Sequence, residues 1–246
     1  MRASIGLVAS IGLPLVLSAQ AGTFPPDSLV NTKVIPRSVP VTQVIGMMRN
    51  FTSDLGVRCQ FCHAGQEGQP LSQFNFVTDE KRTKVVARQM MLMVQEINRR
   101  VDTLPGHGPD DPTVTCATCH RGVAKPMPLS AVIAQAGGAA GADSAIRAYQ
   151  ALRQRYYGSG SYDFGESQLN IAAFRLGRAS KFPEALALLA LNEEFFPKSS
   201  GMYVFKGNVL LMKADTGAAA EAYHEAIRRD SANAEARGRL RDIGRP

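Results

Sequence analysis

One five-residue motif occurs twice in this chain, and it constrains the structure more than any other feature. Residues 59–63 (CQFCH) and 116–120 (CATCH) both have the form C-x-x-C-H, and together they contain all four cysteines of the 246 residues. At this spacing two thiols lie about one helical turn apart, with an imidazole directly behind them. The thiols can add to the two vinyl groups of one haem, and the histidine then lies under the iron as an axial ligand. We therefore predict two covalently attached haem c groups, held by Cys59, Cys62, His63, Cys116, Cys119 and His120.

Paired cysteines have other uses, which the residues around them do not favour. A thioredoxin-like dithiol requires a strand before the pair, and no strand pattern appears anywhere in the sequence. Two C-x-x-C pairs can together bind zinc through four thiolates, and the 53 residues between the pairs do not exclude this. Zinc binding gives no reason, however, for a histidine to follow both pairs. Disulfides, the usual state of cysteines in exported proteins, do not explain this arrangement either.

The first 21 residues are typical of an export signal. Arg2 is followed by an apolar stretch from Ile5 to Leu17, and Ala19 and Ala21 fit the A-x-A cleavage pattern. The apolar stretch is too short for a bilayer-spanning helix, although an uncleaved anchor is the alternative. We predict a periplasmic protein cleaved near Ala21, with membrane association only through a partner or an uncleaved signal. Haem attachment outside the cytoplasm agrees with this prediction.

The formal net charge of +7 is spread over the chain rather than concentrated. Residues 22–130 hold 12 basic and 9 acidic side chains, and residues 131–246 hold 15 and 12. No run of Lys and Arg of the kind that binds nucleic acid is present. We therefore expect no nucleic-acid partner.

Composition and periodicity predict an all-α protein in four parts. After the signal peptide (1–21), residues 22–130 form a diheme cytochrome domain that begins with a proline-rich extended arm. Residues 131–142, rich in Ala and Gly, are interpreted as a flexible linker. Residues 143–246 return to helical periodicity, starting with an amphipathic helix at about 143–156.

Two helices of the cytochrome part carry candidates for the second axial ligand of each iron. Apolar residues recur at helical spacing from Val41 to Leu55 and from about Asp79 to Val101, with Thr78 or Asp79 as the expected N-cap of the second helix. Met48 lies on the apolar face of the first helix and Met90 on that of the second. Methionines at helical spacing are more often core residues, but each of these helices directly precedes a haem motif. Periodicity does not choose between Met90 and Met93.

The last part repeats itself with a period of 34 residues. Residues of the same kind recur at this distance. Small residues form the pairs Ala173 and Gly207, and Ala185 and Ala219; large residues form the pair Leu189 and Tyr223; and helix breaks are expected at Pro197 and Ser231. This pattern resembles the tetratricopeptide repeat, in which small residues let two antiparallel helices approach. Asn192 departs from the pattern, because it occupies a position where a small residue is expected. We predict a short helical-repeat domain that docks a partner.

The haem segments resemble a known family. Residues 44–63, which include Met48 and the first motif, and residues 85–98 with 114–122 are similar to segments of the cytochrome c subunit of photosynthetic reaction centres. In that family each unit is a helix carrying the axial methionine, a turn, and a helix that opens with C-x-x-C-H. The resemblance implies Met48 as the distal ligand opposite His63 and Met90 opposite His120. His107, near where a second histidine ligand would fall, is interpreted as a loop residue, and His224 as a surface residue.

These observations predict an exported diheme electron carrier rather than an enzyme. Iron ligated by both histidine and methionine is closed, and it passes electrons to redox partner proteins without binding a small-molecule substrate. One alternative is an enzyme with one open haem iron, such as a peroxidase-like protein. Another is a cytochrome subunit of a photosynthetic or respiratory membrane complex.

Overall fold

The structure, a computed structural model, describes residues 23–245, so the predicted signal peptide lies outside the described part. Within these residues the chain is all-helical, as predicted, and its only strand-like feature is an isolated antiparallel bridge between Ala64 and Asn75. No helix in this range is long and apolar enough to cross a membrane. The chain divides into two compact units, residues up to 52 with 57–114 and residues 53–56 with 115 onward, and each is described by itself.

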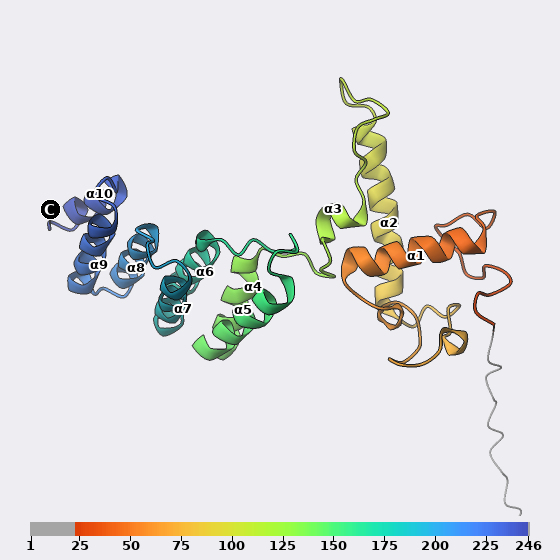
Figure 1. Cartoon of the computed structure of the whole chain (residues 1–246), viewed down its shortest axis with the longest axis horizontal. Helices are drawn as coiled ribbons and strands as arrows, with labels where there is room; N and C mark the ends of the chain where they lie inside the picture. The colour runs from red at the N-terminus through yellow and green to blue at the C-terminus, as the bar shows by residue number, and fades with distance from the viewer. Residues whose placement is uncertain (1–22, 246) are drawn as a thin grey trace, which may run out of the picture. The chain divides into compact units, whose positions relative to one another are not determined.

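The first unit is built mainly from two long helices. These are α1 (Val41–Leu55), whose last turn is grouped with the second unit, and α2 (Arg82–Val101). The loop between them contains two short 3₁₀ turns, η1 (Cys59–Phe61) and η2 (Leu71–Gln73), and is shown in orange below the helices in Figure 1.

The second helix of this unit begins later than the sequence predicts. It starts at Arg82 with Lys81 as N-cap, and neither Thr78 nor Asp79 caps it. The reason is that the Asp79 carboxylate has other partners, among them Lys33 of the N-terminal arm at 2.8 Å. The arm, as predicted, forms no helix and lies against the domain.

Few apolar side chains of the first unit are buried. Among its described residues only Val44 and Phe74 are, with 7% and 9% of their surface exposed. By contrast, α2 exposes 41% of both Val85 and Val86. Protein chains rarely leave an apolar face of this kind uncovered.

The second unit has one continuous hydrophobic core instead. Seven helices form it in sequence, and Figure 1 shows them in series from green to blue: α4 (Leu129–Ala140), α5 (Ala142–Tyr156), α6 (Glu166–Arg178), α7 (Phe182–Phe195), α8 (Gly201–Met212), α9 (Thr216–Arg229) and α10 (Ala234–Asp242). Successive helices pair as hairpins, of which α6 with α7 and α8 with α9 contact each other most extensively. The core extends from Leu129 to Leu240.

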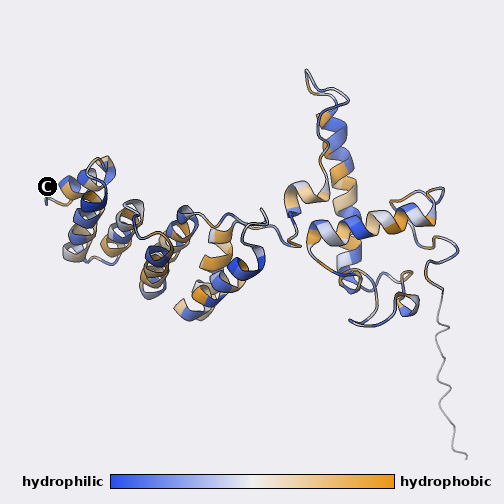
Figure 2. Ribbon diagram, viewed as in Figure 1, coloured by the Kyte–Doolittle hydropathy of each residue, from blue (hydrophilic) through white to orange (hydrophobic). Residues whose placement is uncertain are grey.

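The prediction of a flexible linker at residues 131–142 is wrong. Residues 129–140 form α4, which Figure 2 shows as a largely hydrophobic helix. Ile133 is fully buried, and a Cβ added to Gly137 would lie 3.1 Å from the Leu176 side chain on α6. Small residues here serve close helix packing rather than flexibility, and the two uses look alike in composition.

Positions of the predicted repeat lie where two helices approach closely. Ala173, Ala185 and Ala219 are fully buried. Helix α9 begins 34 residues after the start of α7, and 34 residues is also the period of the predicted repeat. The helical hairpins thus agree with the predicted period, and their assignment to the tetratricopeptide class stays a prediction.

Candidate functional site

The first C-x-x-C-H motif forms a 3₁₀ turn rather than a regular helix. The Cys62 and His63 amides both donate to the carbonyl of Cys59, at 3.2 and 3.0 Å. The Thr83 hydroxyl of α2 donates to the Phe61 carbonyl and so attaches this turn to the helix that follows. Cys59 and Cys62 are both free thiols and half-buried. Burial raises the pKa of the Cys62 thiol, while the Thr83 hydroxyl acts in the opposite direction.

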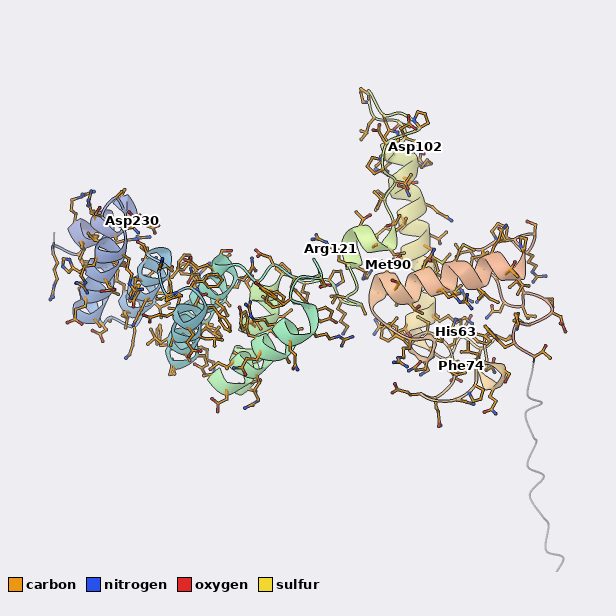
Figure 3. All side chains as sticks on the ribbon, in the orientation of Figure 1. His63, Phe74, Met90, Asp102, Arg121 and Asp230 are labelled. Atoms are coloured by element: carbon orange, nitrogen blue, oxygen red, sulfur yellow. The ribbon has the colours of Figure 1, made fainter. Side chains whose placement is uncertain are left out.

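His63 lies against an aromatic cluster. Its ring packs edge-on against Phe76 with a centroid distance of 4.8 Å, and Phe76 stacks in turn on Phe74. Burial, followed by the charges of Lys84 and Arg88, lowers the pKa of His63 to about 4. The imidazole is therefore neutral at physiological pH, which is the form that binds a metal. Figure 3 shows His63 and Phe74 on the irregular segments between α1 and α2.

An open surface depression of about 430 Å³ lies beside the first cysteine. Thr52, Val57, Cys59, Leu71 and Phe74 are among the residues that line it. Polar side chains such as Arg58, Gln66 and Glu67 line it as well, whereas Cys62, His63 and Met48 do not, so the depression is not by itself a haem site.

The second motif is a short helix, α3 (Cys116–His120). At its start the Thr115 amide donates to the Thr118 hydroxyl at 3.0 Å. Cys116 is half-buried and Cys119 exposed, and both are free thiols. Burial raises the pKa of Cys116, with the nearby Asp54 carboxylate acting in the same direction.

The ring of His120 is held by a hydrogen bond in a way that suits a metal ligand. Its Nδ1 lies 3.0 Å from the carbonyl oxygen of Val123. A carbonyl only accepts, so Nδ1 carries the proton and the Nε2 lone pair is left for a metal. A hydrogen bond of this kind holds the ring in place and makes the imidazole a better electron donor to a metal. The Nδ1 atom of His63, by contrast, is buried without a hydrogen-bond partner in the described part of the chain.

The predicted methionines lie on the two long helices of the cytochrome part. Met48 is half-buried on α1, and so is its neighbour Met47. On α2, Met90 and Met93 are 40% and 49% exposed, so exposure does not choose between them. Figure 3 labels Met90 on α2. Met90 belongs to the first unit and His120 to the second, and each is described only within its own unit.

The residues present fit the predicted haem groups. Each motif offers two unbonded thiols beside a histidine, and α2 exposes apolar side chains and thioethers that a flat apolar group would cover. Within residues 23–245, no group of three or more His, Cys, Asp and Glu side chains is arranged to hold a metal ion.

Sequence reasoning missed several residues that shape these sites. Phe76 and Thr83 contact the first motif, and the Val123 carbonyl orients His120. A backbone carbonyl has no sequence signature. The glycine at position 122, directly before Val123, was the one available signal of a tight turn there.

The second motif lies in a segment that matches a known family. The family of the photosynthetic reaction centre cytochrome C subunit matches residues 70–163. This match includes α2 with Met90 and the second motif, and it continues through α5; the first motif and Met48 precede it. No solved structure matches the chain.

Three individual proteins are similar to part of this chain. Cytochrome c-554 of Chloroflexus aurantiacus is 35% identical over 96 residues, which cover 35% of this chain and 21% of that protein. The photosynthetic reaction center cytochrome c subunit of Roseobacter denitrificans is 32% identical over 116 residues, covering 41% of this chain and 30% of that protein. The same subunit of Thermochromatium tepidum is 34% identical over 91 residues, or 33% and 21% of the two chains. The chain thus spans between 21% and 30% of the length of these relatives.

Proposed function

Since residues 70–163 belong to the family of the photosynthetic reaction centre cytochrome c subunit, we propose that this protein is an exported diheme c-type cytochrome that transfers one electron at a time. The single observation that carries the proposal is the state of His120. Its Nδ1 proton is donated to Val123 at 3.0 Å, directly behind two free thiols on one helical turn. Such a hydrogen bond orients a ligating histidine and leaves its Nε2 atom available for the iron.

The chain's own residues have separate tasks in this function. Cys59 and Cys62, and likewise Cys116 and Cys119, would attach the vinyl groups of one haem each, with His63 and His120 as the axial ligands. When bound, haem c supplies an iron that alternates between the ferric and ferrous states. The aromatic rings beside His63 would exclude water from the haem that His63 ligates. A low-dielectric surrounding of this kind is one of the means by which a protein sets a haem potential.

Met48 and Met90 are proposed as the distal ligands. A thioether from each helix would close the sixth position of one iron, which favours electron transfer over the binding of small molecules. The exposure of Met90 leaves its thioether free to reach an iron, and the same is true of Met93. Closed irons bind no substrate, so we propose an electron carrier rather than an enzyme.

Optical spectra of the haem-loaded protein test the ligands. We expect two low-spin haems, each with the weak near-infrared band of a methionine–iron bond. Met48→Ala removes the band of one haem and Met90→Ala that of the other. Met47→Ala and Met93→Ala are the matched controls, because each removes a thioether within three positions on the same helix.

The outcomes separate this function from its rival. Loss of a band in Met93→Ala and not in Met90→Ala would move the second ligand to Met93. A high-spin haem in the unmutated protein, or binding of carbon monoxide without denaturation, would mean an open iron and an enzyme instead.

The helical stack of the second unit is proposed to dock a redox partner, since stacked helical hairpins present extended binding surfaces. Deleting residues 143–246 is not a clean test, because α4 packs against α6 and the deletion would open the shared core.

A photo-crosslinker placed at the exposed Ala190 or His224 tests the docking surface without this disruption, and the exposed Leu104 of the first unit is the control position. Crosslinks from Ala190 or His224 to a protein that exchanges electrons with this chain are expected. Such crosslinks from Leu104 alone would contradict docking on the stack.

Export to the periplasm is proposed from residues 1–21 and from the chemistry of haem attachment. N-terminal sequencing of the haem-loaded protein from periplasmic extract should begin after Ala21. A mature protein that retains Met1 and fractionates with membranes would support the uncleaved anchor instead.

A further inference from the structure

The backbone immediately after His120 forms a tight turn. The Val123 amide donates to the His120 carbonyl at 2.8 Å. Arg121 and Gly122 have φ values of 46° and 80°, both in the left-handed region. Two left-handed residues in succession are the pattern of a type I′ turn. The turn brings the Val123 carbonyl back to the Nδ1 of His120, and it therefore creates the hydrogen bond that orients the axial ligand.

This turn contains an unfavourable residue. Gly122 adopts a left-handed conformation freely, but Arg121 has a Cβ that crowds the backbone there. Such conformations persist only when the surroundings hold them. The turn therefore depends on contacts from outside residues 120–123.

Two hydrogen bonds provide these contacts. The Gly122 amide donates to the carbonyl of Asp54 at 2.8 Å, at the C-terminal end of α1. The Ser161 hydroxyl donates to the carbonyl of Arg121 at 2.6 Å. Gly56 approaches the turn so closely that a Cβ there would lie 2.0 Å from the Gly122 oxygen. The Ser161 bond is the only one of the two that comes from a side chain, so a single substitution can remove it.

Ser161 belongs to the helical stack rather than to the motif. It lies in the segment between α5 and α6, which turns at Gly158 and Gly160 with φ values of 79° and 77°. Within that segment its amide donates to the Ser159 hydroxyl at 3.2 Å. The loop is thus folded so that one hydroxyl reaches the residue that follows the axial histidine.

We propose that Ser161 is a positioning residue for His120, and that through it the helical stack sets the reduction potential of the haem that His120 ligates. This inference rests on the proposed function. When the turn is held, the Nδ1–H bond to Val123 makes the imidazole a better electron donor, which stabilises ferric iron and lowers the potential. When the turn loosens, this bond weakens and the potential rises.

Potentiometric titration of the haem-loaded full chain tests the proposal. In Ser161→Ala one of the two midpoint potentials should shift upward while the other stays unchanged. Ser167→Ala is the matched control, because this serine is exposed on α6 and forms no side-chain hydrogen bond within the described residues. Adding Arg121→Gly to Ser161→Ala should return the shifted potential toward its original value, since glycine adopts the turn without support.

Each result decides between the two proposals. Two attached haems whose potentials do not move in Ser161→Ala would overturn the positioning role and leave the proposed function intact. Absence of haem from the unmutated protein would overturn both. If Ser161→Ala alone fails to attach a second haem, recovery in the double variant with Arg121→Gly supports the proposal, and continued loss contradicts it.

Discussion

Asp79 is the residue on which the N-terminal arm depends. Its carboxylate accepts from the Asn31 side chain and pairs with Lys33, both at 2.8 Å. From α2 it pairs with Lys84 at 3.3 Å and Arg88 at 2.9 Å. The Lys84 ammonium is buried and also donates to the carbonyls of Phe76 and Thr78. One carboxylate thus joins the arm, the loop before α2 and α2 itself.

Replacing Asp79 by Asn should release the arm and lower the thermal stability of the first unit. Hydrogen bonds from Arg88 and Lys33 hold the pKa of Asp79 well below its usual range. Its stabilising effect is therefore complete above the unfolded pKa of about 3.9 and is lost as the pH falls through the lower folded value. The difference in melting temperature between the original protein and Asp79→Asn should be constant from about pH 7 to pH 5 and shrink below about pH 4.

Glu80→Gln is the control for this experiment, because Glu80 is the acidic neighbour and is exposed. Circular dichroism melts over the pH series and limited proteolysis of residues 23–40 provide the measurements. Equal melting temperatures of Asp79→Asn and Glu80→Gln at neutral pH would show that the arm is held elsewhere.

The roles of some residues can be predicted from the sequence, and those of others cannot. The cysteines and histidines of the motifs are recognisable, because haem attachment requires those residue types at one spacing. Asn192 departed from the repeat pattern without an apparent reason. In the structure it is fully buried and donates to the Glu166 carbonyl at 3.0 Å and the Asn170 side chain at 2.8 Å, which joins α7 to α6. Such a pair depends on tertiary contacts, so periodicity could not predict it.

At the scale of elements, close approach of helices organises the stack. A Cβ at Gly207 of α8 would lie 2.4 Å from the ring of Tyr223, a fully buried residue of α9. The Tyr223 hydroxyl donates to the Asn208 side chain at 2.8 Å and so cannot move away without losing a partner. The second hairpin of the predicted repeat therefore depends on this glycine.

Gly207→Ala should destabilise the second unit by about 1–3 kcal/mol, because the added methyl group overpacks the contact. Gly217→Ala on α9 should be neutral or stabilising by up to about 1 kcal/mol, since no atom lies within 4 Å of the added Cβ and alanine favours the helix. Urea unfolding followed by circular dichroism measures both. Equal stability of the two variants would mean that α8 and α9 are not in close contact.

Some elements could be predicted with their bounds, and α4 could not. The helices at 41–55 and 142–156 follow apolar periodicity, and their observed bounds agree with the pattern within one residue. Helix α4 was missed, because an Ala- and Gly-rich segment has the composition of a linker. What makes it a helix of the core is the burial of Leu129 and Ile133 against other helices, and sequence composition does not contain that information.

At the scale of the whole molecule, the two units differ in what stabilises them. The second has a core of its own, whereas the first buries only Val44 and Phe74 among its described apolar side chains. A unit with so little buried apolar surface is marginal by itself. We infer that attached haem would supply the missing core of the first unit.

Removal of the first attachment site should therefore affect the two units unequally. In Cys59→Ala/Cys62→Ala, amides of α1 and α2 should exchange with solvent much faster, while those of α6 to α9 keep their protection. Hydrogen exchange followed by mass spectrometry measures this. Unchanged protection of α2 would show that the first unit folds without the group.

If each motif covalently binds one haem, intact mass spectrometry of the mature protein should detect both groups. We expect a mass equal to the chain from residue 22 plus two haem groups, with both groups retained in acid and organic solvent. Replacing Cys59 and Cys62, or Cys116 and Cys119, by Ala should each remove one group. A mature chain that carries no haem, or that carries zinc on its thiolates, would contradict this expectation.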